Sequence, residues 1–531
     1  MGAVVSTIGE VYDALAALWS EMSQNATETK ALLRRIANPE FPVPNPTVSF
    51  WEINPLHPEL VDIRSERLPD SADIVIIGSG ISGASIAYTV LTECQALGVE
   101  KRVVILEGRQ VCSGATGRNG GHIKCSPYLA YSELKALLGP KKAHNVLRYQ
   151  LRHLSTILDL AEAEEFKEAE AREVETVDLY MDQTAWDKVQ GLVRDLQREV
   201  PECAHDTIVC NATQAKEKFG LSEHCCGAIS YRAGAIWPYR LITSIYSTLL
   251  SRHKEYFSLE TDTMARVIRV ENDDVAPYRI CTSRGDIRTT HVVHATDAFA
   301  PNLIPGLKGK LFPVRGHMSA QAAEGPSQEL DGVRSWSIIG KKGFEYITQR
   351  PRIPTGPHEL GGEVMLGGGL FKSDGDGIDE IGIWKDDCVD PTISAYLSGI
   401  WSVALKDENT RVLQLWSGCM GFTTDLVPFV GPVAPVFTNR RLSNDRREKC
   451  SGPGRVPPNE WISAGFNGEG MVLAWLSGTA VGLMLLGLEN SHLEARPGRP
   501  AGKVTDWLPE EVYLTEARIR DSSIYKLARI L

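Results

Sequence analysis

One segment in the first fifth of the chain constrains the fold more than any other. It reads DIVIIGSGISG over 73–83, an apolar run that leads into three closely spaced glycines. A helix-forming stretch follows at 84–97, and a second apolar run, 103–106, ends on the acid Glu107. A strand, a glycine turn, a helix and a second strand ending on an acid predict a βαβ unit that binds a dinucleotide.

Each part of this unit has a physical role. Gly78 makes the tight turn, Gly80 lets the backbone approach a pyrophosphate, and Gly83 allows the helix to pack closely on the strand. The helix N-terminus offers free N–H groups and a positive dipole to the phosphates. Glu107 is placed to accept hydrogen bonds from ribose hydroxyls, and its charge disfavours a 2′-phosphate. The residues expected to bind the cofactor here are Gly78, Ser79, Gly80, Ile81, Ser82, Gly83 and Glu107.

The composition is that of an ordinary globular enzyme. The chain has 531 residues, enough for two to three domains, with 43% hydrophobic and 23% charged residues. Its formal net charge of −11 argues against nucleic acid as a partner. Eleven cysteines without a CxxC pair indicate reduced, intracellular thiols rather than disulfides or a zinc site, so no metal is expected.

Targeting signals are weak, and we expect a cytoplasmic protein. Acids at Glu10 and Asp13 argue against a signal peptide, and the C-terminus is not a peroxisomal SKL-type signal. The start MGAVVS matches the loose pattern for myristoylation at Gly2. Residues 470–487 form an uncharged run of transmembrane length, but the run follows a glycine turn and contains four glycines. We therefore expect a buried helix rather than a membrane span.

The order of strand-like segments predicts two interleaved domains. Nucleotide-type strands occur near 73–107, 290–297 and 461–486, and antiparallel-looking strands fill the intervals. The expected division is a helical and proline-rich extension (1–70), a cofactor domain (71–127, 228–312 and 410–487), a second domain (128–227 and 313–409), a surface insertion (438–459) and a C-terminal segment (488–531).

Three further motifs point to FAD rather than to a nicotinamide cofactor. The loop SGATGRNGGH (113–122) lets backbone approach a flat ligand, and the strand VVHATDA (292–298) brings small residues close to it. In WISAGFNGEGM (461–471), a helix N-terminus aimed at the flavin N1–C2=O edge would stabilise the anionic reduced ring. Taken singly, these motifs also suit a mobile loop, a core strand and a structural helix start. The expected contacts are Ser113, Gly114, Ala115, Thr116, Arg118, Asn119, Gly120, Gly121, His122, Val267, Ala295, Thr296, Gly465, Phe466, Asn467, Gly468, Glu469, Gly470 and Met471.

Five further patches accompany these motifs: AIWPYRLI, FPVRGH, YITQRP, MLGGG and WSGCMGFTTDLVPFVGP. Over roughly 70–520, all of them follow the order found in one known protein family. The chain resembles the D-amino-acid-oxidase-like (DAO) family of FAD-dependent amine and amino-acid oxidoreductases. The resemblance is greatest to the branch with γ-glutamylputrescine oxidoreductase, glycine oxidase and monomeric sarcosine oxidase. It implies a glutathione-reductase-like, Rossmann-type FAD domain of α/β class. An antiparallel substrate domain is interleaved with it, and the flavin lies between the two.

The resemblance also implies a reaction. Hydride would pass from the carbon that bears an amine to flavin N5, water would hydrolyse the imine, and O2 or another acceptor would reoxidise the flavin. The partners are then a small amine or amino acid and an electron acceptor. Three alternatives stay open: a dehydrogenase that uses another acceptor, a biosynthetic flavoenzyme that acts on another centre, and a non-catalytic FAD-binding protein. Neither the substrate nor the oligomeric state follows from the sequence.

Four residues are carried over as site residues from this resemblance. Arg315 and His317, in FPVRGH, are expected beside the flavin, where a cation favours the reduced ring and O2 reduction. The alternative for His317 is a structural histidine held by hydrogen bonds. Tyr346 and Arg350, in EYITQRP, are expected on the substrate-facing sheet. Arg350 has two possible roles, as a bidentate partner for a substrate carboxylate or as half of a surface salt bridge.

Two side chains are candidates for a covalent bond to the flavin. In the sarcosine-oxidase branch a cysteine before methionine carries the cofactor, and Cys419 stands in a partly matching stretch, CMGFTTD. The alternative for Cys419 is a small buried thiol near the ring. His122 is a second, weaker candidate.

Overall fold

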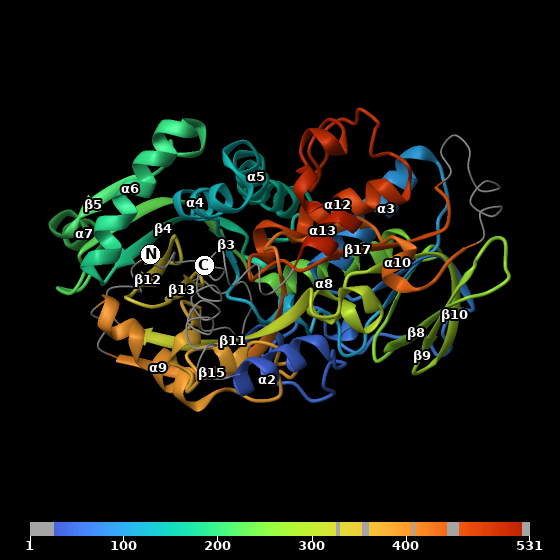
Figure 1. Ribbon diagram of the computed structural model, residues 1–531, viewed down its shortest axis with the longest axis horizontal. Coiled ribbons are helices and arrows are strands. Elements are labelled where there is room, and N and C mark those ends of the chain that lie inside the picture. The colour runs from blue at the N-terminus through green and yellow to red at the C-terminus, as the bar shows by residue number, and fades with distance from the viewer. Residues whose placement is uncertain (1–25, 325–329, 353–360, 406–408, 443–455, 523–531) are drawn as a thin grey trace.

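The computed structural model describes residues 26–324, 330–352, 361–405, 409–442 and 456–522. Its strands form two sheets, one of eight and one of nine strands, that occupy different parts of the molecule (Figure 1). The N-terminal stretch expected at 1–70 is described from Ala26 onward. The myristoylation pattern and most of the surface insertion lie outside the described residues.

The first sheet is the dinucleotide-binding one. Its strand order is β16-β17-β10-β1-β2-β7, with β8 and β9 joined to the edge of β10. Five neighbouring strands, β17, β10, β1, β2 and β7, are parallel. Of these, β1 and β2 read as nearly continuous apolar runs, as strands covered on both faces do. The strands are β1 (Ser71–Ile77), β2 (Val103–Leu106), β7 (Phe257–Glu260), β8 (Ala265–Val270), β9 (Tyr278–Thr282), β10 (Gly285–His294), β16 (Phe429–Pro432) and β17 (Asn459–Ala464).

The predicted βαβ unit is confirmed as β1, helix α3 and β2. Helix α3 (Ile81–Leu97) begins three residues earlier than expected, with Gly80 as its N-cap and Gly98 in the left-handed conformation at its C-terminal end. The earlier start places the first helical turn inside the glycine motif. Its N–H groups are therefore close to any group bound at that turn.

The second sheet is largely antiparallel. Its order is β15-β11-β14-β13-β12-β4-β6-β3, with β5 paired to β6, and only β4 and β12 run parallel within the described residues. Its strands are β3 (His122–Ile123), β4 (Arg172–Tyr180), β5 (Ile208–Asn211), β6 (Gly227–Ala235), β11 (Leu311–Glu324), β12 (Arg334–Ile339), β13 (Phe344–Gln349), β14 (Val364–Gly368) and β15 (Asn409–Thr423).

The chain crosses between the two sheets several times, as the interleaved prediction requires. Three strands pair differently from the expected division: β3, β6 and β15 were assigned to the cofactor domain and belong to the second sheet. The reason for β15 is its long register with β11, which runs from Leu311 opposite Thr423 to Glu324 opposite Asn409. Glycine-rich sequence at 416–421 suits a close approach to a ligand equally well in either sheet, so the motif alone does not assign the strand.

Helices cover both sheets. Helix α9 (Pro391–Leu405) and α2 (Ala26–Ala37) pack near β11, and Figure 1 shows both along one edge of the molecule. The remaining helices are α4 (Pro127–Leu138), α5 (Pro140–Ala163), α6 (Gln183–Glu199), α7 (Ala212–Phe219), α8 (Pro238–Arg252), α10 (Pro435–Thr438), α12 (Ala474–Leu485) and α13 (Glu516–Asp521).

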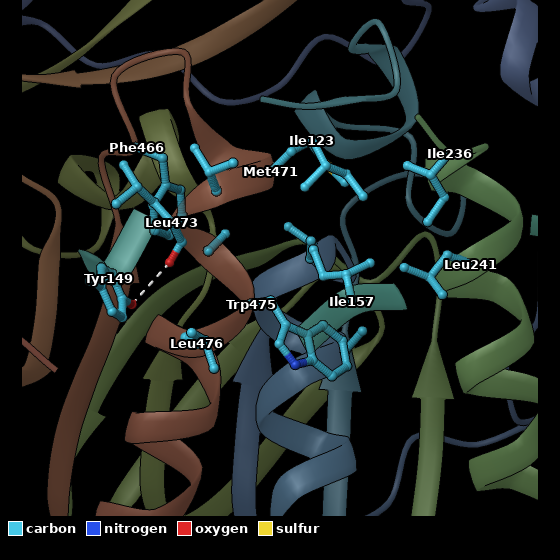
Figure 2. Packing of buried hydrophobic residues seen from close by; sticks show 14 of the residues in the cluster. Ile123, Tyr149, Ile157, Ile236, Leu241, Phe466, Met471, Leu473, Trp475 and Leu476 are labelled. Carbon is cyan, nitrogen blue, oxygen red and sulfur yellow. Dashed lines mark hydrogen bonds between the residues drawn. The ribbon is translucent and has the colours of Figure 1, made fainter. Parts of the chain in front are cut away.

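The long uncharged run at 470–487 is confirmed as a buried helix. Every residue of α12 is buried, and Figure 2 shows Trp475 and Leu476 packed in the core, with the Tyr149 hydroxyl donating to the Leu473 carbonyl at 3.2 Å. Among the described residues no helix is long and apolar enough to cross a membrane.

Small residues let α12 lie close against α3. A Cβ added at Gly478 would stand 2.8 Å from the Ser85 Cβ and 2.9 Å from the Ser82 carbonyl oxygen. The Ser85 hydroxyl donates to the Trp475 carbonyl at 2.5 Å. Neither helix can therefore shift relative to the other, or carry a larger side chain at this contact, without disturbing the turn that begins α3.

We expect Gly478→Ala to destabilise the protein by about 1–3 kcal/mol, because the added methyl group meets backbone that cannot yield. The matched control is Gly399→Ala on α9, which meets nothing within 4 Å. That change should stabilise by up to about 1 kcal/mol through helix propensity. Thermal unfolding of both variants measures the difference; equal shifts would contradict the packing argument.

Candidate functional site

A long cavity lies where the carboxyl ends of the parallel strands face the second sheet. Its wall includes the last residues of β1 and β2 and those that follow β10 and β17. This is the edge at which open α/β sheets bind nucleotides. From there the cavity continues past the loop at 114–120 to strands β11, β12 and β13.

The glycine turn has the geometry that its sequence predicts. Gly78 has φ of +109°, and a Cβ there would lie 2.4 Å from the Ala295 carbonyl oxygen. A Cβ at Gly83 would lie 2.1 Å from the Gly78 carbonyl oxygen. Gly78 therefore allows the turn and contact with the segment after β10, while Gly83 lets the helix start against the turn. Gly83 does not line the cavity, so its role is packing alone.

Glu107 lines the cavity beside this turn. Its Oε2 accepts from the Ser79 N–H at 3.0 Å and the Ser79 hydroxyl at 2.6 Å, and its Oε1 accepts from the Arg109 N–H. Oε1, for which the structure describes this one donor, retains acceptor capacity for a ribose hydroxyl. The Thr296 hydroxyl, also on the wall, is buried without a hydrogen-bond partner among the described residues. An acid at the end of β2 and an unmatched hydroxyl both fit a bound dinucleotide.

A buried charge network supports the loop at 113–120. Arg118 donates to the carbonyls of Ser113 at 2.7 Å and Ser417 at 3.0 Å, and it lies 3.6 Å from the Asp386 carboxylate. Asp386 also pairs with Arg109 at 3.0 Å. The N-terminal extension joins in, because the Trp51 indole donates to the Asn119 carbonyl at 2.5 Å. This loop is therefore held from behind while its outer side faces the cavity.

The second glycine turn is held by two buried polar residues. Asp297 accepts from the Gly465 N–H at 2.8 Å and from the Gly421 N–H at 2.7 Å. Asn467 accepts from the Thr423 N–H and donates to the Gly465 carbonyl. Gly465 and Asn467 thus shape the turn without reaching the cavity, whereas Phe466 and the residues from Gly468 onward line it.

Glu469 places a carboxyl group on the cavity wall. The described hydrogen bond to it comes from the Gln150 amide at 2.5 Å. Burial raises the pKa of Glu469 from its ordinary value to about 7, and the Gln150 hydrogen bond lowers it only in part. The group therefore changes charge near neutral pH.

Most of the residues predicted to contact the cofactor do line this cavity. They are Gly78, Ser79, Gly80, Ile81, Ser82, Glu107, Gly114, Ala115, Thr116, Arg118, Asn119, Gly120, His122, Ala295, Thr296, Cys419, Phe466, Gly468, Glu469, Gly470 and Met471. Ser113, Gly121, Gly465 and Asn467 lie in the same loops but behind the wall. Val267 is placed elsewhere: it is 44% exposed on β8 and does not line the cavity.

Arg315 and His317 do not reach the cavity. Side chains alternate along β11, so Gly316 and Met318 face the cavity while Arg315 and His317 face the other side of the sheet. Arg315 forms a two-point ion pair with Glu380 at 2.6 and 2.8 Å. His317 Nε2 accepts from the Asp390 N–H at 2.9 Å, and burial lowers its pKa to about 4. We expected a cation beside the flavin from these residues; the alternation of the strand directs both away.

Of the two residues predicted on β13, only Tyr346 lines the cavity. Its hydroxyl lies 3.1 Å from the Met318 sulfur. Arg350 is instead buried between two acids, with contacts of 2.6 Å to Glu170 and 2.9 Å to Glu363. Arg350 therefore forms salt bridges as expected, but they are buried rather than at the surface, and the guanidinium does not line the cavity where a substrate carboxylate would lie.

Cys419 and His122 both line the cavity, and burial keeps each of them in its neutral form. Burial raises the pKa of the Cys419 thiol, which donates to the Ile383 carbonyl at 3.5 Å. Burial holds the pKa of His122 well below its ordinary value, and its Nε2 lies 2.9 Å from the Ser335 hydroxyl. A thiolate is the nucleophilic form of cysteine, so the surroundings of Cys419 disfavour attack on a flavin.

Among the described residues, seven polar ones on the wall were missed by the sequence analysis: Arg109, Lys124, Ser126, Asp178, Asp297, Asn302 and Ser337. Asp178 carried the clearest signal, because it interrupts the apolar strand sequence TVDLYM, and an acid inside a buried strand needs a partner. Lys124 follows the SGATGRNGGH loop by two residues, and nothing in its local sequence marks it.

The first sheet, its glycine turn and the acid at the end of β2 define a dinucleotide-binding protein. The second sheet and a cavity continuing onto it define a flavin-dependent oxidoreductase fold. The family described as FAD dependent oxidoreductase (DAO) matches residues 73–482, and the chain belongs to this family. The expected cofactor, FAD, is confirmed at the level of the family.

Individual relatives are distant. The chain is 20% identical over 438 residues to the probable oxidoreductase OrdL of Haemophilus influenzae, which covers 79% of this chain and 84% of that protein. The structure of glycine oxidase from Geobacillus kaustophilus superposes with a TM-score of 0.60 at 18% identity, over 84% of this chain and 99% of that one. Iminodiacetate oxidase from Chelativorans sp. BNC1 gives a TM-score of 0.56 at 17% identity, over 82% and 98%. These structures share the fold.

We predict that Glu469→Gln stabilises the protein more at pH 8 than at pH 5. A carboxyl pKa raised to about 7 means that between about pH 4.5 and 7 the native state binds more protons than the unfolded chain. Stability therefore falls as the pH rises through this window, and the amide removes that loss. Thermal unfolding at the two pH values should show it, with Glu217→Gln, an exposed acid on α7, as the control. The same pH dependence in wild type and Glu469→Gln would contradict the assignment.

A second prediction concerns the flavin linkage. Because burial keeps the Cys419 thiol protonated and the His122 Nε2 is engaged with the Ser335 hydroxyl, acid precipitation of the purified protein should release all of its FAD into the supernatant. Yellow colour in the washed pellet is the contrary result. Cys419→Ala and His122→Ala would then identify the residue that carries the cofactor.

Proposed function

We propose that the protein oxidises a C–N bond of a small amine or amino-acid-like molecule, with O2 as the electron acceptor. The observation that carries the proposal is the continuity of one cavity from the nucleotide edge of the first sheet onto the second. A molecule held on the second sheet would then meet the reacting end of a cofactor anchored at the first. Two of the similar structures are an oxidase of glycine and an oxidase of iminodiacetate, which supports a nitrogen-containing substrate.

The residues expected to hold the cofactor divide by position. Gly78–Ser82 and Glu107 would bind the ADP half, through the N-terminus of α3 and an acid for the ribose. The loop at 114–120 and the turn at 466–471 would hold the flavin half. Bound FAD supplies the chemistry that no side chain can, which is acceptance of a hydride from carbon.

The side chains on the cavity wall would orient the substrate, exclude water from it and accept a proton from its ammonium group. The walls contributed by Met318, Phe344 and Tyr346 are apolar or aromatic, so they exclude water around the substrate. A substrate amine must lose its proton before its carbon can release hydride. Glu469 lies on the wall and ionises near pH 7, which suits a group that accepts a proton from a substrate ammonium.

Anaerobic mixing tests the proposal. Purified holoprotein is mixed with primary amines, secondary amines and amino acids, each paired with the alcohol or 2-hydroxy acid of the same carbon skeleton. We expect at least one nitrogen compound to bleach the flavin absorbance and its oxygen counterpart to leave it unchanged. Bleaching by the oxygen compounds alone would assign the enzyme to another centre, and bleaching by no compound would sink the proposal.

Readmission of air separates an oxidase from a dehydrogenase. We expect the flavin colour to return within seconds and hydrogen peroxide to form in equal amount to the substrate oxidised. Slow recovery without peroxide, accelerated by a quinone or an artificial dye, would show that O2 is not the acceptor.

A further inference from the structure

Lys124, Asp178 and Ser337 form a polar cluster on the second sheet. Asp178 on β4 and Ser337 on β12 stand on adjacent central strands, and Lys124 reaches them from the segment after β3. All three line the cavity, at the end away from the glycine turn of β1. The Lys124 side chain is only 10% exposed and that of Asp178 is 1% exposed. Buried charges are rare in sheet cores unless they are paired or serve a ligand.

Asp178 is held by four donors from the described part of the chain. Its Oδ1 accepts from the Lys124 ammonium. Its Oδ2 accepts from the hydroxyls of Tyr128 at 2.5 Å, Tyr231 at 2.7 Å and Ser126 at 3.3 Å. Three donors engage Oδ2 and the Lys124 ammonium engages Oδ1, so the carboxylate is committed to residues of the protein. Its effect is on Lys124: it balances the ammonium charge and holds the head group in one position.

Lys124 and Ser337 have donors to spare. An ammonium has three N–H groups, and among the described residues two of them find acceptors, Asp178 and the Ser337 oxygen at 2.5 Å. Because an ammonium cannot accept, the Ser337 oxygen must be the acceptor, which leaves the Ser337 proton free to be donated elsewhere. The described residues offer no acceptor for that proton. Two adjacent donors, one N–H and one O–H, are thus left at the cavity wall.

We propose that Lys124 and Ser337 bind the carboxylate of the substrate, so that the natural substrate is a carboxylate-bearing amino acid rather than a simple amine. This inference rests on the proposed C–N oxidation. A carboxylate offers two adjacent acceptor oxygens, which match two adjacent donors. A simple amine would leave both donors unmatched inside the protein, a state that costs about 1–3 kcal/mol for each buried polar group.

The charges on the wall agree with a zwitterion. Lys124 and Asp178 balance each other, and an amino acid carries its own ammonium to balance its carboxylate. Arg350, the residue that the sequence had suggested for this role, is occupied by Glu170 and Glu363. We therefore assign binding of the substrate carboxylate to Lys124, which lies in a different segment of the chain from Arg350.

Binding of matched acids and amides tests the assignment without any turnover. The probes are benzoate with benzamide and acetate with acetamide, titrated against the holoprotein while the flavin absorbance is followed. We expect at least one acid to perturb the flavin spectrum and its amide to bind at least 10-fold more weakly. Lys124→Met should weaken binding of that acid at least 10-fold, Lys124→Arg should restore part of it, and Ser337→Ala should weaken it several-fold. The control is Lys135→Met, a lysine on α4 that pairs with Glu199 at the surface.

Two results would overturn the inference: no acid perturbs the flavin, or the acid binds Lys124→Met as tightly as wild type. If Lys124→Met does not retain FAD, Ser337→Ala decides, since it removes one donor and keeps the ion pair. Failure of the proposed function is a separate result. Acid binding that depends on Lys124, together with no bleaching by any nitrogen compound, would preserve the anion site and reject the oxidation chemistry.

Discussion

The contact between the start of α3 and the ends of β1 and β10 is the constraint on which the rest of the structure depends. Gly78 and Gly83 leave no room for a Cβ, with distances of 2.4 and 2.1 Å to backbone oxygens. This closeness brings the N-terminus of α3 to the carboxyl edge of the parallel sheet, where its dipole and free N–H groups face the cavity. The packing of α12 on α3 through Gly478 holds the helix in that position.

A second set of interactions ties the N-terminal extension to the site. Arg109 and Arg118 share the buried carboxylate of Asp386, and Glu52 lies 3.5 Å from Arg118. Burial raises the pKa of Glu52 to about 7 even beside these cations. Such clusters are sensitive to the loss of one member, because the remaining charges are then unbalanced. The N-terminal extension therefore helps to hold the cavity wall in place. Its proline-punctuated sequence did not indicate this role.

The cofactor half of the site was largely predictable, and the substrate half was not. The turn at Gly78–Gly83 combines local requirements of turn, helix start and strand, so each residue's role can be argued from its immediate neighbours. The prediction for Arg315 depended instead on which face of β11 carries the odd-numbered positions. A strand alternates strictly, and an error of one residue reverses every side chain. Motif similarity placed the right strand near the cavity but did not determine the face.

The sequence by itself determined the dinucleotide fingerprint, the burial of the apolar helix at 470–487 and the class of cofactor. The first two depend on contiguous residues, and the third depends on several short motifs whose order along the chain is visible in the sequence. Only the tertiary structure decided which charged groups meet. Lys124 and Asp178 are separated by more than fifty positions, and their pairing follows from the order β12-β4-β6-β3 in the second sheet. The same strand pairing commits Arg350 to Glu170 and leaves Lys124 and Ser337 at the cavity. Long-range sheet register, which no local pattern encodes, is the physical reason.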